Sequence, residues 1–415
     1  MAIIFNVKRQ LDEFLENQGC STTVKFLDKR LCEMGDLLIK SRTDTDIHFD
    51  VEALQRTSAC WPLPIHRISI ASNVAYIWFE RKIAFRSAIA AKEWKLPMTD
   101  RSNDSVRLYL EPPAIQVGTS NSMAHFRANA LRTVMKNCFI HAGYIVVEKD
   151  QLEDANMLAP VKKIAFVQRK TKMSYEQQGE TVDRQHVVEI LSGPVLIGSD
   201  LANAEDYVKR RSNEMQLIAQ HRYGVRIHDV NELERIVASL GRSAAIVDVL
   251  QQKHSSTIDM RVTGLGTTRT PTATKGAAFI LYNFARLVSI FKKYRLMMEQ
   301  EGYPRIPPVD EVDFGLLTDP EEWHLLYVYV IGFPYAVRRT LGDGDLERIA
   351  PHHLLEFTFG LVSCLSKYYR STRILTDNRP KLVPVMIARL HLLEAIYNVL
   401  QTLLHLLDLE PIEEM

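Results

Sequence analysis

The chain has 415 residues, which is enough for two or three domains of ordinary size. Hydrophobic residues make up 46% and charged residues 24%, a composition typical of a globular protein rather than of a disordered one. The formal net charge is +1, which excludes a uniformly basic nucleic-acid binder, so any RNA-binding surface must be local.

The sequence predicts neither a secretory nor a membrane segment. The apolar run that follows Met1 is too short for a signal-peptide core. The best candidate for a membrane span, residues 325–333, is about half the roughly 20 residues that a span requires. The five cysteines are scattered without metal-ligand spacing, which favours reduced thiols in a cytoplasmic protein and leaves a nuclear location open.

Residues 1–104 are predicted to form an N-terminal α/β region. Apolar residues at helical spacing predict helix across residues 5–40, including a second amphipathic run at 24–38. Alternating apolar and polar residues predict strands at 62–72 and, less regularly, at 74–79.

Residues 105–262 are predicted to form a second α/β domain of degenerate Rossmann-like type. A strand at 105–110, a helix at 121–141 and a strand at 144–148 give the strand–helix–strand order that opens such a domain. Further strands are expected at 164–168 and 187–190, and helices at 204–221 and 230–240.

Residues 263–274 are rich in Gly, Thr and Pro without periodicity and are predicted to be a linker. The composition then changes. Long apolar-periodic segments at 279–300, 321–341, 351–370 and 382–407, separated by Pro, Gly and Asp, predict an all-α bundle over residues 275–415.

The helix at 279–294 has two distinct faces. Ile280, Phe284, Leu287 and Phe291 fall on an apolar stripe, whereas Tyr282, Arg286 and Lys293 share another face. An aromatic side chain with two cations could stack on an unpaired base and hold phosphates. The spacing alone equally allows an ordinary solvated face.

Two other basic clusters are candidates for RNA contacts. One combines Tyr368 and Tyr369 with Arg370 and Arg373. The other is a run of five cations from Lys162 to Lys172 without an acidic residue, which a solvated strand edge would also explain. The bundle as a whole has 15 Lys and Arg against 18 Asp and Glu, so ordinary surface charge remains an alternative.

Common catalytic motifs are absent from the sequence. It contains no GxGxxG after a strand, no Walker A motif, no HExxH and no GxSxG, so we predict no catalytic residues and no cofactor. The pair His352-His353 has no carboxylate or cysteine at metal-ligand spacing. We therefore predict no metal site and interpret these histidines as surface or capping residues.

Five motifs follow one another along the bundle: residues 282–286 (Tyr-Asn-Phe-Ala-Arg), 317–323 (Leu-Thr-Asp-Pro-Glu-Glu-Trp), 332–337 (Gly-Phe-Pro-Tyr-Ala-Val), 351–357 with Tyr368 and Tyr369, and 388–393 with the closing residues 406–415. This series resembles the DALR anticodon-binding domain of arginyl-tRNA synthetases. The resemblance implies an anticodon-binding bundle. Tyr282 would stack on a base, Arg286 would contact a base edge or phosphate, and Met415 would place the terminal carboxylate at the loop.

Lys275, Tyr369 and Lys293 are weaker RNA-binding candidates under the same resemblance. Arg389 lies among Val385, Leu392 and Ile396 on an apolar face, so we interpret it as a structural ion-pair partner instead.

The resemblance extends weakly into residues 106–147, where a synthetase carries its ATP-binding HIGH box. His125 and Arg127 fall on family positions. However, Ser122 stands where the family has its first His, and Ala124 where it has Gly. Both departures argue against adenylate formation. About 130 residues separate Gly143 from the bundle, fewer than the family's full active site needs.

Residues 274–276, 298–300, 302–304 and 307–309 are similar to a non-catalytic branch of the family. That similarity implies an adaptor that binds the anticodon stem–loop of arginine tRNAs and presents them to a methyltransferase-like enzyme that forms 3-methylcytidine, without a DNA or membrane partner. The alternatives are a protein-interaction scaffold without tRNA binding and a divergent arginyl-tRNA synthetase with residual activity.

Overall fold

The computed structural model describes residues 2–27, 35–43, 46–92, 107–113, 122–152, 161–168, 187–198, 203–222, 230–260 and 276–412. The chain divides into two compact units, each assembled from three stretches of sequence. Unit 1 consists of residues 1–97, 290–335 and 363–399, and unit 2 consists of residues 98–289, 336–362 and 400–415. The units therefore do not follow the four consecutive segments that the sequence predicts, because the three long helices of the bundle each supply residues to both units.

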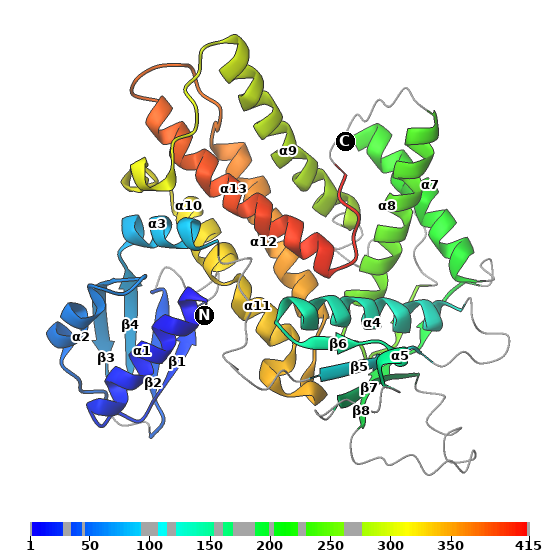
Figure 1. Cartoon of the computed structure of the whole chain (residues 1–415), viewed down its shortest axis with the longest axis horizontal. Helices are drawn as coiled ribbons and strands as arrows, with labels where there is room; N and C mark the ends of the chain where they lie inside the picture. Colours follow the sequence, from blue (N-terminus) through cyan, green and yellow to red (C-terminus); the bar gives the residue numbers. More distant parts are fainter. Residues whose placement is uncertain are drawn as a thin grey trace. The chain divides into compact units, whose positions relative to one another are not determined.

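Unit 1 begins with an α/β layer whose sheet is antiparallel (Figure 1). Strands β1 (Thr22–Phe26), β2 (Leu37–Ser41), β3 (Ile65–Ala71) and β4 (Val74–Phe79) lie in the order β1-β2-β4-β3. Helix α1 (Ile3–Asn17) packs against β1, and α2 (Val51–Ser58) packs against β3. Helix α3 (Arg81–Ala91) follows β4 directly.

The prediction of helix throughout residues 5–40 is wrong after Asn17. Gly19 has a positive φ of 74° just beyond α1, a backbone conformation that ends a helix and that glycine adopts without strain. Val24 and Phe26 alternate with polar residues, and they form β1 because β2 pairs with it antiparallel. A pairing between strands is a non-local interaction that helical spacing within one segment does not reveal.

Unit 2 contains a parallel sheet, as the Rossmann-like prediction requires. Strands β5 (Arg107–Glu111), β6 (Ile145–Val147), β7 (Val161–Gln168) and β8 (Val187–Ser192) lie in the order β6-β5-β7-β8. Helix α4 (Met123–His141) connects β5 to β6 and runs along the sheet in Figure 1. The chain then returns to the other side of β5, and such a change of direction is where ligands bind in sheets of this type.

Three further helices and a short strand pair complete this part of unit 2. Helix α5 (Lys149–Leu152) follows β6, and α7 (Ala204–Arg222) pairs with α8 (Val230–Leu250), which extends about ten residues beyond the predicted 230–240. Strands β9 (Val195–Leu196) and β10 (Ile258–Asp259) pair in parallel. The predicted linker at 263–274 lies outside the described residues.

The four predicted bundle helices are present. They are α9 (Ala277–Gln300), the continuous segment α10 (Pro320–His324), η5 (Leu325–Ile331) and α11 (Phe333–Thr340), then α12 (His352–Ser371) and α13 (Val383–Leu406). Short 3₁₀ turns connect them: η3 (Val309–Glu311), η4 (Phe314–Leu316), η6 (Gly342–Gly344) and η7 (Leu346–Arg348). Segment η5 is a π-helix, and all seven of its side chains are buried.

Helix α13 corrects the expectation that no segment approaches the length and hydropathy of a membrane span. It has 24 residues, and its most apolar stretch has a mean hydropathy of 1.4. Arg389, His391 and Glu394 interrupt the apolar run, which is why a search for continuous apolar residues passes over it. In the folded chain 61% of that stretch is buried, as is typical of a core helix.

Candidate nucleic-acid interface

Helix α9 presents the two residues predicted to contact RNA. Tyr282 and Arg286 stand one turn apart and are both partly exposed. Ile280, Phe284 and Leu287 are buried, with at most 1% of their surface exposed, so the predicted apolar face is confirmed over residues 280–287. Phe291, the last residue of the predicted stripe, is partly exposed. Tyrosine and arginine at this spacing give a ring for stacking beside a cation for a phosphate or a base edge.

The remaining candidates on the bundle differ in accessibility. Lys293 is exposed on α9. Tyr369 is only 8% exposed, so its ring offers little surface to a base, and the structure does not favour it as an RNA contact. Lys275 and Met415 lie outside the described residues, as do Arg169 and the rest of the predicted basic patch beyond β7. Its first two members, Lys162 and Lys163, are exposed on β7.

Glu322 organises the interior of the bundle in unit 1. Its side chain is fully buried, and its Oε1 accepts hydrogen bonds of 2.8 Å from both Arg389 Nε and Tyr368 Oη. Its Oε2 accepts a third bond, of 3.0 Å, from the backbone N–H of Asp319. The interpretation of Arg389 as a structural ion-pair partner is confirmed.

Tyr368 therefore belongs to the core and not to the aromatic–basic surface cluster predicted from its neighbours. It is fully buried, and burial beside Glu322 raises the pKa of its phenol, so it remains a neutral donor. Arg370 and Arg373 are exposed, and Arg373 pairs with Asp377 at 3.3 Å. What is left of this cluster at the surface is two arginines without an accessible ring.

The junction of β5 and α4 is where the degenerate HIGH-like box was predicted. Ser122 is the N-cap of α4, and its Oγ accepts a hydrogen bond of 3.2 Å from the backbone N–H of His125. Ala124 and His125 occupy the first turn of the helix and are partly exposed. The serine thus caps the helix, which is a local structural role that a hydroxyl performs well.

Arg127, one turn further along α4, has a structural role. Its guanidinium is fully buried and donates to four backbone carbonyls, those of Gly193, Val249, Lys253 and Ser256, at 2.6–3.2 Å. Burial lowers the pKa of this guanidinium to about 10, so it stays protonated at neutral pH. Arg127 joins α4 to the end of α8 and to the loop before β9, and all its nitrogens are used there.

The N-terminal sheet carries an aromatic and basic surface that the sequence did not reveal. On β4, Ala75 and Ile77 are buried whereas Tyr76 and Trp78 point to the opposite face and are partly exposed. The guanidinium of Arg67, on the adjacent strand β3, lies 3.8 Å from the centre of the Trp78 ring. Lys25 and Lys40 are exposed on β1 and β2, and the strand pairing places them on this same face.

Alternation along β4 is the one sequence signal for this surface. Helical spacing over residues 24–38 predicts a helix instead of β1 and β2, and so gives Lys25 no place on a sheet. The strand residues of this face include three cations and no acidic residue. We refer to Lys25, Lys40, Arg67, Tyr76 and Trp78 as the sheet patch.

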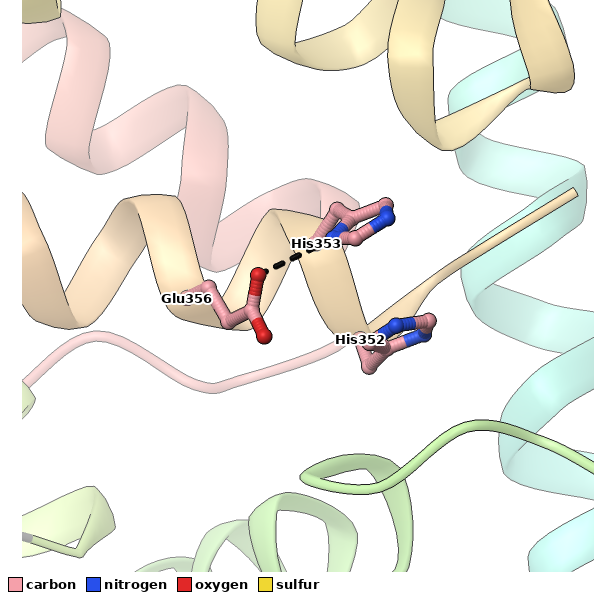
Figure 2. Close-up of side chains that lie close together, drawn as sticks. All are labelled: His352, His353 and Glu356. Atoms are coloured by element: carbon pink, nitrogen blue, oxygen red, sulfur yellow. Dashed lines mark hydrogen bonds and ion pairs between the residues drawn. The ribbon is translucent and has the colours of Figure 1, made fainter. Parts of the chain in front are cut away.

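One cluster among the described residues could hold a metal ion. His352, His353 and Glu356 begin α12, and each offers a ligand atom within 4.8 Å of the others (Figure 2). The prediction that no carboxylate stands at metal-ligand spacing is wrong, because Glu356 follows His352 by four residues and therefore lies on the same side of the helix.

Solved structures share this architecture. The fold matches the arginyl-tRNA synthetase of Thermus thermophilus with a TM-score of 0.69 over 99% of each chain, at 11% sequence identity. The family model of the DALR anticodon binding domain matches residues 280–415. The chain thus has an arginyl-tRNA synthetase-like fold, with N-terminal α/β sheets and a C-terminal helical DALR domain, as the motifs predicted.

Two curated relatives are similar in sequence. The DALR anticodon-binding domain-containing protein 3 of Danio rerio is 28% identical over 258 residues, which are 60% of this chain and 45% of the relative. The protein of the same name from Rattus norvegicus is 36% identical over 146 residues, 34% of this chain and 27% of the relative. The chain spans less than half the length of these relatives, so the activity and partners of the whole proteins can be carried to it only as proposals.

Proposed function

We propose that this chain binds the anticodon stem–loop of arginine tRNAs and acts as a non-catalytic adaptor. The observation that carries the proposal is the partly exposed pair Tyr282 and Arg286 on α9, within residues that match the DALR anticodon binding domain. RNA loops are recognised through unpaired bases that stack on aromatic rings, with cations on the neighbouring phosphates. The bundle is slightly acidic, so binding depends on local contacts of this kind.

The sheet patch supports binding of RNA outside the anticodon loop. An exposed sheet face with two aromatic rings and three cations suits a single-stranded or unpaired segment, because bases stack on the rings while the cations contact phosphates. A tRNA has such segments besides its anticodon. Two separate RNA-binding surfaces would give the chain more affinity for a whole tRNA than for a stem–loop.

The lack of catalysis is proposed from the β5–α4 junction. Ser122 is engaged as a helix cap, and Ala124 brings a methyl group where the synthetase family has glycine, so two groups that ATP binding requires in that family are replaced. The Danio rerio and Rattus norvegicus relatives are named for an anticodon-binding domain, whereas other similar proteins, such as that of Moorella thermoacetica, are named arginine–tRNA ligases.

The adaptor role itself rests on the resemblance to the non-catalytic branch of the family. It implies that bound arginine tRNA is presented to a methyltransferase-like enzyme that forms 3-methylcytidine in the anticodon loop. We place this activity in the cytoplasm, in agreement with the scattered cysteines. The described cysteines, Cys20, Cys60, Cys138 and Cys364, form no disulfide with one another.

Affinity purification of this chain from cytosol tests the proposal, with sequencing of the bound RNA and mass spectrometry of the bound proteins. Enrichment of arginine tRNAs together with a tRNA methyltransferase is the expected result. Protein partners without any enrichment of tRNA would support the scaffold alternative instead. Arginine-dependent ATP–pyrophosphate exchange by the purified chain would support the divergent synthetase and overturn the non-catalytic proposal.

A further inference from the structure

Helix α12 opens with two adjacent histidines and a glutamate that converge on one place. His352 is the first residue of the helix, His353 follows, and Glu356 lies one turn later (Figure 2). His353 Nδ1 is 2.9 Å from Glu356 Oε2, and the two imidazole rings have centres 4.2 Å apart. None of these side chains takes part in the RNA-binding surfaces described above.

The imidazole of His352 is incompletely satisfied. Its Nδ1 is shielded from solvent and has no hydrogen-bond partner among the described residues. A buried polar nitrogen without a partner costs free energy, and such atoms in folded proteins commonly mark the position of a water molecule or an ion. Histidine binds a metal ion through a ring nitrogen that carries no proton.

The distances suit a transition metal of the zinc class. Bonds of about 2.0–2.2 Å from Zn²⁺ to histidine nitrogen and carboxylate oxygen place tetrahedral ligands roughly 3.4 Å apart. The His353–Glu356 pair is already near that separation at 2.9 Å, and all three ligand atoms lie within 4.8 Å. A closure of about 1.5 Å by side-chain rotation would complete three ligands, and water would fill the fourth position.

Access and ligand chemistry restrict the kind of ion. His353 has 24% of its side chain exposed and Glu356 has 62%, so an ion can enter from solvent. Two imidazoles with one carboxylate favour Zn²⁺, Co²⁺ or Ni²⁺ over Mg²⁺ and Ca²⁺, which prefer sites made of oxygen ligands.

We propose that His352, His353 and Glu356 form a binding site for one divalent transition-metal ion at the start of α12. The ion would replace the His353–Glu356 hydrogen bond with bonds to a common centre and would bring His352 into the same set. It would thereby fix the first turn of α12 and the preceding turn at Pro351. The site is structural, and the proposal does not depend on the proposed RNA-binding function.

Titration of the full-length chain with Co²⁺, without an affinity tag, tests the site. We expect one Co²⁺ per chain with visible absorption bands typical of four- or five-coordinate cobalt, and displacement of the ion by Zn²⁺. His353→Asn and Glu356→Gln change exposed or half-exposed side chains, so both variants should fold, which circular dichroism checks. Each should weaken binding by at least about tenfold.

His66→Asn is the matched control. His66 Nδ1 also lies near a carboxylate, 3.4 Å from Glu80, but no third ligand atom is grouped with this pair among the described residues. This variant should bind Co²⁺ as the parent chain does. The proposal is overturned if the parent shows no stoichiometric binding, or if binding survives both α12 variants unchanged.

Discussion

Three buried ionisable side chains in this protein are stabilised in three different ways. Glu322 has a cation and a phenol as partners, Arg127 has four backbone carbonyls and no carboxylate, and Asp36 accepts two N–H donors. A buried charge without such partners would lower the free energy of unfolding by several kcal/mol. Each set of contacts is therefore needed for a stable fold. Each also joins segments that are far apart in sequence.

Asp36 should make the stability of unit 1 depend on pH. Its Oδ1 accepts from Trp323 Nε1 at 2.9 Å and its Oδ2 from the Phe79 backbone N–H at 2.8 Å, but burial outweighs both bonds and raises its pKa from 3.8 to about 6. The folded state therefore binds this proton more tightly than the unfolded state. Above pH 6 the buried carboxylate of Asp36 is charged and lowers the stability of the folded state. This destabilisation disappears as the pH falls toward 4.

From pH 7 to pH 5 the Asp36 contribution to the free energy of unfolding should rise by about 1 kcal/mol. Urea unfolding at pH 5, 6 and 7 measures it, with Asp36→Asn as the comparison. The variant should show a shallower rise on acidification than the parent, because other titrating groups are common to both. Parallel pH profiles would show that Asp36 does not titrate in this range.

Tyr282 provides the residue-scale test of tRNA binding. Tyr282→Ala should weaken binding of an arginine-tRNA anticodon stem–loop by about 5- to 150-fold, since loss of one base–aromatic stack costs about 1–3 kcal/mol. Fluorescence anisotropy gives the two dissociation constants. Tyr282→Phe keeps the ring and should bind nearly as the parent does. Equal affinity of the alanine variant would remove Tyr282 from the interface.

At the scale of the elements, the junction between η5 and α11 requires a glycine, Gly332. The Gly332 N–H donates to Tyr327 O at 3.0 Å, five residues earlier, which is the π-helical pattern. A Cβ at Gly332 would lie 2.3 Å from Val328 O and 3.0 Å from the ring of Phe26. The backbone oxygen cannot move aside without disturbing the helix, so this position excludes a side chain.

Gly332→Ala should therefore lower the free energy of unfolding by about 1–3 kcal/mol, the usual range for steric overpacking of a core. Thermal and urea unfolding measure the loss. Gly276→Ala is the control, because a Cβ there would have Arg211 as its nearest neighbour, at 4.0 Å. If the two variants were equally stable, the close approach at Gly332 would be of no energetic consequence.

The sheet patch can be tested as an element. Replacing Lys25 and Lys40 together by Ala should weaken binding of a whole arginine tRNA and reduce its dependence on salt, because fewer counterions are released from the RNA on binding. Arg9→Glu, on the exposed side of α1 with 54% of its side chain exposed, is the control for charge alone. An unchanged slope of log Kd against log salt in the double variant would exclude the sheet patch from the interface.

At the scale of the whole molecule, unit 1 combines residues 1–97 with parts of the helical bundle. We therefore predict that the bundle does not fold as an independent domain. Tyr327 of η5 stacks on Phe26 of β1, with ring centres 4.7 Å apart, and Trp323 of α10 packs edge-on against Phe85 of α3 at 5.9 Å. A chain consisting of residues 275–415 would expose these rings and leave Trp323 without its acceptor Asp36.

We expect this fragment to unfold at a lower temperature than the full chain, with a broad transition. Circular dichroism measures both, and binding of the hydrophobic dye ANS reports the exposed aromatic surface. A sharp transition at the temperature of the full chain would show that the bundle folds independently of residues 1–97.

Local patterns in the sequence were sufficient for most elements and for the class of the protein. The period of the apolar residues predicted all four long helical segments of the bundle, and alternation predicted β3 and β4, because burial of one face imposes that period directly. The spacing of Tyr282 and Arg286 likewise placed both on one side of α9. Motif order was enough to indicate the DALR domain, which occupies residues 280–415.

Tertiary structure alone decided which residues share a surface and which are buried. Tyr369 and Tyr282 are the same residue type in similar helical contexts, yet Tyr369 is buried at 8% exposure whereas Tyr282 is partly exposed. The sheet patch exists because β1 and β2 pair with each other and β2 pairs with β4, which places side chains from separate strands on one face. Such burial and pairing depend on residues that are distant in the sequence. The periodicity of a segment predicts which face of one helix or strand is apolar, but it does not predict which other element packs against that face.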